Sequence, residues 1–90
     1  MDVRWDPAKA ASNLHKHGIR FSDAEAVLFD PIAVTVEDRG AVGEQRFVSV
    51  GADVRGRVVV VVYTYRADHT RLISARGATL NERRAYEEGV

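Results

Sequence analysis

The stretch VVVVVYTYRADHTRLISAR, residues 58–76, decides the fold of this 90-residue chain. Residues 58–63 form an uninterrupted apolar run, which is typical of a strand buried on both faces at the centre of a sheet. RADH, residues 66–69, has the composition of a turn, and TRLISAR alternates again over residues 70–76. Two strands joined by so short a segment predict an antiparallel hairpin.

Shorter segments before this hairpin also show the two-residue period of strands. Apolar residues alternate with small or polar ones over residues 32–36, and Val48 and Val50 alternate with Phe47 and Ser49. The turn-like segments DRGAVG and ADVRG lie between the strands. We therefore expect an antiparallel meander of four strands, to which DVRW at residues 2–5 could add a short fifth.

Helix signals stand at both ends of the chain. Asp6-Pro7 predicts the start of a helix that ends at Gly18, since proline suits the first helical position and glycine the left-handed end. SDAE at residues 22–25 matches a capping box and predicts a short helix over residues 23–28, which ends before Asp30-Pro31.

A second capping box, TLNE at residues 79–82, predicts a C-terminal helix that ends near Gly89. The layout is that of an α+β domain over residues 1–90. It has an antiparallel four- to five-stranded sheet, two N-terminal helices and one C-terminal helix.

The composition excludes several classes of protein. The chain has no cysteine, so disulfide frameworks and thiolate metal sites are excluded. Its longest apolar run is far shorter than the about 20 residues of a membrane-spanning helix, and no signal-peptide pattern opens it. We expect a soluble, cytoplasmic protein. The net charge of zero is a cancellation, because residues 46–84 carry eight arginines against three carboxylates. Such a segment could bind a polyanion, or form a solvated sheet face.

NLHKHG, residues 13–18, concentrates titratable and cationic side chains. His15 and His17 are two residues apart, which places them on different sides of a helix and argues against one shared metal ion. Four residues form a single polar stripe by helical spacing: Lys9, Asn13, Lys16 and His17. The stripe is either a solvated face or a cationic ridge with a histidine that can move a proton.

Arginines at the ends of the predicted core strands are a second candidate. Arg66 follows the central strand and Arg76 ends the next one, so both could form a phosphate clamp or simply extend from the sheet edge. Two-residue spacing places Ser74 and Arg76 on one face with Leu72. By the same spacing, Glu44 and Arg46 share a face and could add an acid–base partner and a cation.

The words WDPAKAASNLHKHGIRFSDAEAVLFDP, VVYTYR and RLISARGATLNERRAYE, in this order from Trp5 to Tyr86, resemble the BrnT family of type II toxins. The family pattern has a basic residue where this chain has Gly77. The resemblance implies a RelE-like fold and a metal-independent endoribonuclease that needs no cofactor and arrests growth. It also implies neutralisation by a BrnA-type antitoxin with a ribbon-helix-helix DNA-binding part, through which alone the chain would reach operator DNA.

Under this resemblance the candidate residues form one RNA-cleaving groove, in which the RNA 2′-OH attacks the adjacent phosphate. The residues assigned to catalysis are His17, Glu44, Arg66 and Arg76, and those assigned to RNA binding are Lys9, Asn13, Lys16 and Arg46. Trp5 and Tyr63 could stack on a base, although core positions are favoured for both. The alternative is a non-catalytic binding module or co-repressor, a degenerate toxin that acts through its antitoxin.

Overall fold

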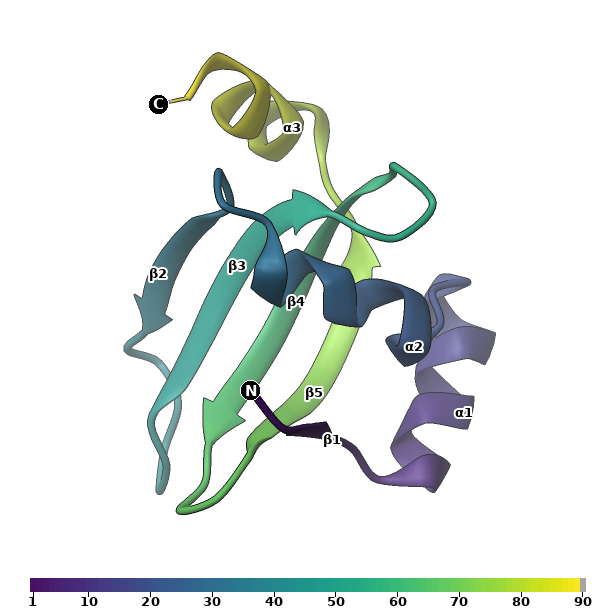
Figure 1. The fold of residues 1–90 in the computed structure, drawn as a ribbon, viewed down its shortest axis with the longest axis vertical. Coiled ribbons are helices and arrows are strands. Elements are labelled where there is room, and N and C mark those ends of the chain that lie inside the picture. The colour runs from purple at the N-terminus through teal and green to yellow at the C-terminus, as the bar shows by residue number, and fades with distance from the viewer. Residues whose placement is uncertain (90) are drawn as a thin grey trace.

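The apolar run at residues 58–63 lies in the middle strand of a five-stranded sheet (Figure 1). The computed structural model describes residues 1–89. In chain order the elements are β1 (Val3–Arg4), α1 (Pro7–His17), α2 (Phe21–Ala24), the 3-10 helix η1 (Glu25–Phe29), β2 (Val34–Asp38), β3 (Arg46–Ala52), β4 (Val58–Tyr65), β5 (Thr70–Gly77) and α3 (Leu80–Glu88). The strand order is β1-β5-β4-β3-β2.

This arrangement confirms the predicted α+β architecture. Strands β2 to β5 form the expected antiparallel meander. The segment DVRW contributes β1, which pairs parallel with the start of β5. Asp6 accepts a hydrogen bond from the Ala8 backbone N–H at 2.8 Å, and Gly18 takes the left-handed conformation with φ of 71°, so α1 begins and ends at the predicted signals.

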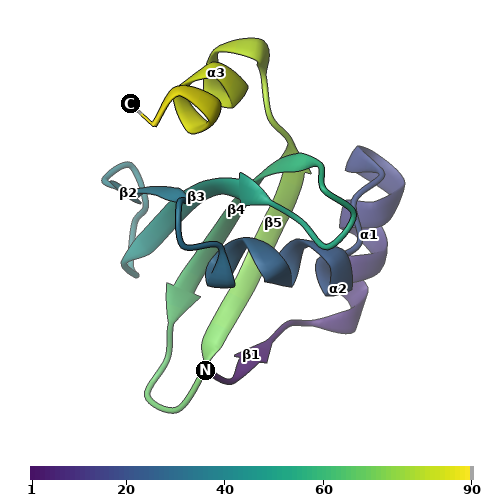
Figure 2. The ribbon, with the colours of Figure 1, turned by 45° about the horizontal axis from the view of Figure 1, so that its top comes forward.

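One face of the sheet, which we call the core face, carries the hydrophobic core. The continuous helical segment of α2 and η1 crosses this face, with α2 on the β5 side and η1 on the β3 side, as two views of the ribbon show (Figures 1 and 2). Burying each large aliphatic or aromatic side chain contributes about 1.5–3 kcal/mol to folding. The buried cluster consists of Ile19, Phe21, Ala24, Val27, Val59, Val61, Tyr63, Leu72 and Ala75.

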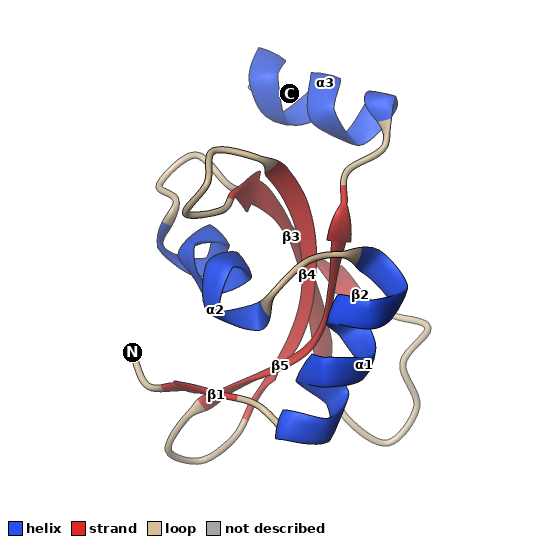
Figure 3. Ribbon diagram, turned by 90° about the vertical axis from the view of Figure 1, so that its right-hand side faces the viewer, coloured by secondary structure: helices blue, strands red, loops and turns tan. Residues whose placement is uncertain are grey.

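The opposite face, which we call the open face, has a floor of aliphatic side chains. Cross-strand partners share a face, so the register assigns these side chains to the side away from the core. The floor is made of Val34, Val36, Val48, Val50, Val58, Val60 and Val62. Val60 is buried, whereas Val36 at the β2 edge is 59% exposed. Helix α1 runs beside the β5 edge, and α3 stands at one end of the sheet (Figure 3).

A β-bulge in β5 corrects one sequence-based expectation. Leu72 pairs with Tyr63 and Ser74 pairs with Val62, so Ile73 is the extra residue. Leu72 therefore points into the core, while Ser74 lies on the open face. The prediction that the two share a face was wrong, because simple alternation takes no account of a bulge, which re-aims the residues that follow it.

The start of α2 is a second correction. The helix begins at Phe21 rather than Asp23, and its N-cap residue is Arg20, which makes no side-chain capping bond. Phe21 is buried and meets the Trp5 ring edge-on at 6.0 Å. Tertiary burial of this ring thus outweighs the local capping signal at Ser22. The end is as predicted, since η1 stops at Phe29 and Asp30 is extended.

Asn13 closes the exposed edge of β5. Its side-chain amide donates to the carbonyl oxygens of Ala75, at 2.8 Å, and Ile19, at 3.0 Å. Its carbonyl oxygen accepts from the Ala75 backbone N–H at 3.0 Å. The side chain thus pairs with β5 as a neighbouring strand would, and it is buried while doing so. This contact fixes α1 against the sheet.

Replacing Asn13 with alanine should lower the free energy of unfolding by about 2–4 kcal/mol, because it leaves buried backbone groups of β5 without partners. Urea unfolding followed by circular dichroism measures the change. Ser12→Ala, on the adjacent exposed position, should stay within about 0.5 kcal/mol of the parent. Equal stability of Asn13→Ala and the parent would contradict this role.

Helix α3 is held mainly by polar contacts, since none of its residues is buried. Its predicted capping box is present: Thr79 accepts from the Glu82 backbone N–H, and Glu82 accepts from that of Thr79. Arg76 forms a two-pronged pair with Glu82 at 2.8 and 2.9 Å. Tyr86 donates a hydrogen bond to Asp30, which itself accepts one from the Ala52 backbone N–H in β3. Helix α3 is therefore connected to β5 through Glu82 and to β3 through Tyr86 and Asp30.

The Arg76 pair should make stability depend on acid pH. The hydrogen bonds from Arg76 lower the pKa of Glu82 from 4.5 to about 2. A depressed carboxyl pKa stabilises the fold above pH 4.5, and this stabilisation is lost as pH falls toward about 2. Unfolding free energy measured across this range should therefore fall more steeply for the parent than for Glu82→Gln. Glu87→Gln, on an exposed position of the same helix, should follow the parent; parallel curves for all three would refute the link.

Candidate functional site

A groove of about 200 Å³ lies between α1 and β5, and we call it the α1–β5 groove. It is lined by Lys9, Ser12, Asn13, Lys16, His17, Ile73 and Ser74. All four residues of the predicted polar stripe therefore line one hollow. They do so because residues spaced by three, four and seven positions lie on the same side of a helix.

The two histidines of NLHKHG differ in their surroundings. His17 lines the α1–β5 groove, whereas His15 does not. Both are exposed in the last turn of α1. The two-residue spacing rotates them by about 200° around the helix axis, so only one can reach the groove. This gives His17 a place beside Lys16 and Ser74 and makes His15 a matched comparison.

Asn13 lines the groove but is fully committed to the backbone. Its oxygen accepts one hydrogen bond and its nitrogen donates two. The side chain therefore positions α1, and Lys9, Lys16 and His17 are the ionisable residues of the groove, all three of them exposed.

A second cationic cluster lies where β3 begins and β4 ends. Arg46 pairs across the sheet with Thr64, on the open face. Glu44 bridges two guanidinium groups, at 3.2 Å from Arg46 and 3.2 Å from Arg66. Glu44 and Arg46 were predicted to lie two apart on a strand and to share a face. Their side chains do meet, although Glu44 lies outside the strand. The carboxylate holds both arginines at one corner of the open face.

Arg76 lies at the other end of the open face. It pairs with Val60, while Arg66 follows β4 six residues later. At about 3.3 Å per residue the two positions are about 20 Å apart along the strand, so they do not converge on one phosphate. The pair with Glu82 raises the pKa of Arg76 and occupies both prongs of its guanidinium.

His17 and Glu44 also lie apart. The α1–β5 groove follows the β5 edge, whereas Glu44 precedes β3, with β4 in between. Two strand spacings separate β5 from β3 by about 10 Å. Ser74, which lines the groove, pairs with Val62, midway between the level of Arg76 and that of Arg46. The open face thus carries arginines at both ends and a cationic groove at the middle of one side.

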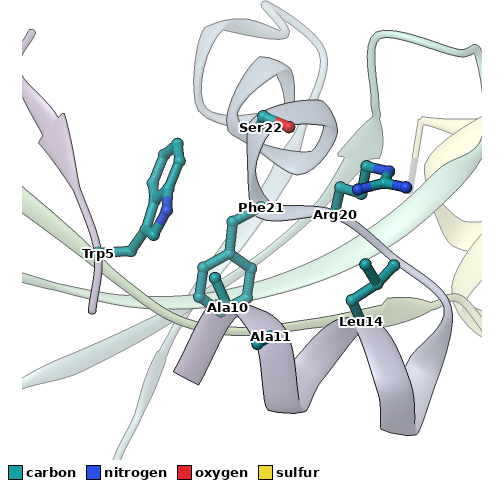
Figure 4. Close-up of a pocket in the computed structure, with 7 residues that line it drawn as sticks. All are labelled: Trp5, Ala10, Ala11, Leu14, Arg20, Phe21 and Ser22. Carbon is teal, nitrogen blue, oxygen red and sulfur yellow. The ribbon is translucent and has the colours of Figure 1, made fainter. Parts of the chain in front are cut away.

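The aromatic candidates behave differently from one another. Tyr63 is buried, and its hydroxyl is hydrogen-bonded to Ser49 at 2.8 Å, as its predicted core position requires. Trp5 is only partly buried and lines a second hollow, of about 230 Å³, between α1 and α2 (Figure 4). Residue spacing does not predict this hollow, because its walls come from segments whose packing no local pattern reveals.

Residues 1–89 contain neither a candidate metal site nor a candidate membrane-spanning helix. No group of three or more histidine, aspartate or glutamate side chains is placed to hold a metal ion there. No helix in the same range is long and apolar enough to cross a membrane.

Comparisons with known proteins found a matching family model and a similar solved structure. The family model described as "Ribonuclease toxin, BrnT, of type II toxin-antitoxin system" matches residues 5–82. The crystal structure of the Brucella abortus ribonuclease toxin BrnT is similar in fold, with a TM-score of 0.69 at 24% identity over 88% of this chain and 97% of that one. No curated protein matches the sequence. Since the family model spans most of the chain, the protein belongs to the BrnT family of ribonuclease toxins of type II toxin–antitoxin systems.

Proposed function

We propose that this toxin is a metal-independent endoribonuclease whose active centre is the α1–β5 groove. The observation that carries the proposal is the meeting of two lysines and a histidine in one hollow at the side of an arginine-bordered sheet face. Cations bind and stabilise phosphate, and a histidine can transfer a proton. Cleavage of RNA by attack of its 2′-OH on the adjacent phosphate needs both kinds of group.

The reaction is a transesterification within the RNA. His17 removes the proton of the 2′-OH, and the 2′ oxygen forms a bond to the adjacent phosphorus. Lys9 and Lys16 stabilise the negative charge of the pentavalent phosphorane. The bond from phosphorus to the 5′ oxygen breaks, and that oxygen takes a proton from solvent. The products are a 2′,3′-cyclic phosphate and a free 5′-OH, and His17 returns its proton to solvent.

The arginines act on different phosphates of the same strand. Arg46 and Arg66 hold the backbone at one end of the open face, with Glu44 orienting both guanidinium groups. Arg76 holds α3 through Glu82 at the other end, and its side chain, still 42% exposed, contacts the backbone there with the N–H groups that the pair leaves free. This division replaces a single two-arginine clamp, since the two ends are about 20 Å apart.

The family implies an antitoxin partner. We propose a BrnA-type antitoxin with a ribbon-helix-helix part, which neutralises the toxin and gives the complex its only access to operator DNA. We also propose that the toxin acts in the cytoplasm, where its RNA substrates are, and that it arrests growth when the antitoxin is missing.

His17→Ala should reduce the rate of RNA cleavage by about 10²–10⁴-fold, because it removes the group that takes the 2′ proton. The assay uses labelled RNA in the presence of a chelator, with analysis of the 3′ ends for cyclic phosphate. His15→Ala is the matched control and should cleave like the parent. If the chelator abolishes cleavage, metal independence is wrong; if His17→Ala cleaves at the parent rate, the assignment of His17 is wrong.

Arg66→Ala should weaken RNA binding and lessen its salt dependence, with the slope of log affinity against log salt falling by about 0.7 for a lost phosphate contact. Fluorescence anisotropy with an RNA blocked at its 2′ hydroxyls measures this without cleavage. Arg55→Ala, in the turn between β3 and β4, is the control that removes an equal charge elsewhere. An unchanged slope for Arg66→Ala would remove Arg66 from the interface.

Expression without an antitoxin separates this function from a non-catalytic co-repressor. The parent should arrest growth, and His17→Ala should not. A folded parent that neither cleaves RNA nor arrests growth would favour the binding module.

A further inference from the structure

The hollow between α1 and α2 is an apolar pocket with a cation at its rim, and we call it the Trp5 pocket. It is lined by Trp5, Ala10, Ala11, Leu14, Arg20, Phe21 and Ser22. The close-up shows Trp5 on one side, Arg20 and Leu14 on the other, and Phe21 between them (Figure 4). None of these residues has a part in the cleavage chemistry proposed above.

The pocket walls are fixed by packing. Phe21 is buried in the core, and its ring meets that of Trp5 at 6.0 Å with an interplanar angle of 80°. This contact fixes the orientation of the indole at the pocket wall. Ala10 and Ala11 are small, so the floor on α1 is shallow and the indole remains accessible from the hollow.

The polar groups are few and available. Arg20 is exposed, and within residues 1–89 no carboxylate lies within 4 Å of its guanidinium. The Ser22 hydroxyl stands at the rim (Figure 4). A flat apolar group would therefore find an aromatic wall, and an attached anion would find a guanidinium. A nucleotide has both parts.

The Trp5 pocket and the α1–β5 groove lie on opposite flanks of the same helix. Ala10, Ala11 and Leu14 face the pocket, while Lys9, Ser12 and Lys16 line the groove. A helix is about 10 Å across with its side chains, so the two hollows are separated by about that distance. The exposed crest of α1 between them carries Ala8, Ala11 and Ser12, whose small side chains leave room for an extended strand, together with His15.

We propose that the Trp5 pocket binds a nucleotide of the RNA substrate on the far side of α1 from the cleaved bond, with the base beside Trp5 and a phosphate on Arg20. The inference rests on the proposed ribonuclease function and adds a base-binding subsite to it. Stacking of a base on an aromatic side chain tolerates different bases, and pocket size then sets the preference. Binding here would hold the strand as it crosses α1 into the groove.

A protein segment is a less suitable occupant. Arg20 is the charged residue in the pocket lining, and Lys9 and Lys16 line the groove across the same helix, so a polyanion that reaches both hollows meets several cations. An apolar side chain followed by an acidic residue would use the same walls but only one of these charges. The experiment below tests both.

Trp5 is the only tryptophan of the chain, so its indole N–H gives one signal in a ¹H–¹⁵N NMR spectrum, which is assigned without further experiments. The folded toxin is titrated separately with nucleoside monophosphates, the matching nucleosides, inorganic phosphate and a blocked Leu-Asp dipeptide. We expect monophosphates to shift the indole signal saturably, nucleosides to bind more weakly, and phosphate alone to leave it unmoved. Arg20→Ala should weaken monophosphate binding about tenfold. Arg83→Ala, an exposed arginine on α3, is the control and should bind like the parent.

The outcomes separate the pocket from the catalytic proposal. An unmoved indole signal with intact RNA cleavage overturns the subsite and leaves the nuclease standing. A saturable shift that needs Arg20, in a protein that cleaves no RNA, supports the subsite and overturns the nuclease. A shift by the dipeptide and not by the monophosphates overturns the subsite and favours a protein partner. If Arg20→Ala binds monophosphates like the parent, the subsite as proposed is also overturned, because the binding does not involve the charge of Arg20.

Discussion

The rest of the structure depends on how the exposed edge of β5 is satisfied. β1 is only two residues long and pairs with the start of that strand. Farther along, α1 covers the backbone of Ala75, whose N–H and C=O groups would have no hydrogen-bond partners there without a side chain that supplies them. Leaving such buried polar groups without partners is costly. Asn13 supplies both a donor and an acceptor there, at 3.0 Å or less. One side chain thus ends the sheet and fixes the helix that carries the candidate catalytic groups.

Fixing α1 at this point decides what each of its flanks can do. On one flank the helix turns Lys9, Lys16 and His17 to the groove beside the open face. On the other it turns Ala10 and Leu14 to Trp5 and Phe21. The helix therefore separates a polar hollow from an apolar one. A substrate with a charged backbone and flat bases could use both, which is why we assign them to a single RNA strand.

The bulge at Ile73 has a similar effect on the sheet. It sends Leu72 into the core and brings Ser74 to the open face, next to the groove. Without it, strict alternation would place both on one side, and either the core would lose a buried leucine or the groove its serine. At the far end, Arg76 and Asp30 tie α3 to the sheet through Glu82 and Tyr86. The open face is therefore bordered by polar contacts, while its floor is aliphatic.

The sequence by itself determined the element order, the antiparallel meander, the caps at Asp6, Gly18 and Thr79, and the polar stripe on α1. These follow from local rules: period, capping chemistry and helical spacing act within a few residues. Only the tertiary structure decided the bulge, the early start of α2, the pairing of Arg76 with Glu82 and the distance between Arg66 and Arg76. It also formed the Trp5 pocket, whose walls come from β1's end, α1 and α2. These features depend on register and on burial between segments far apart in the chain, and no local pattern encodes either of them.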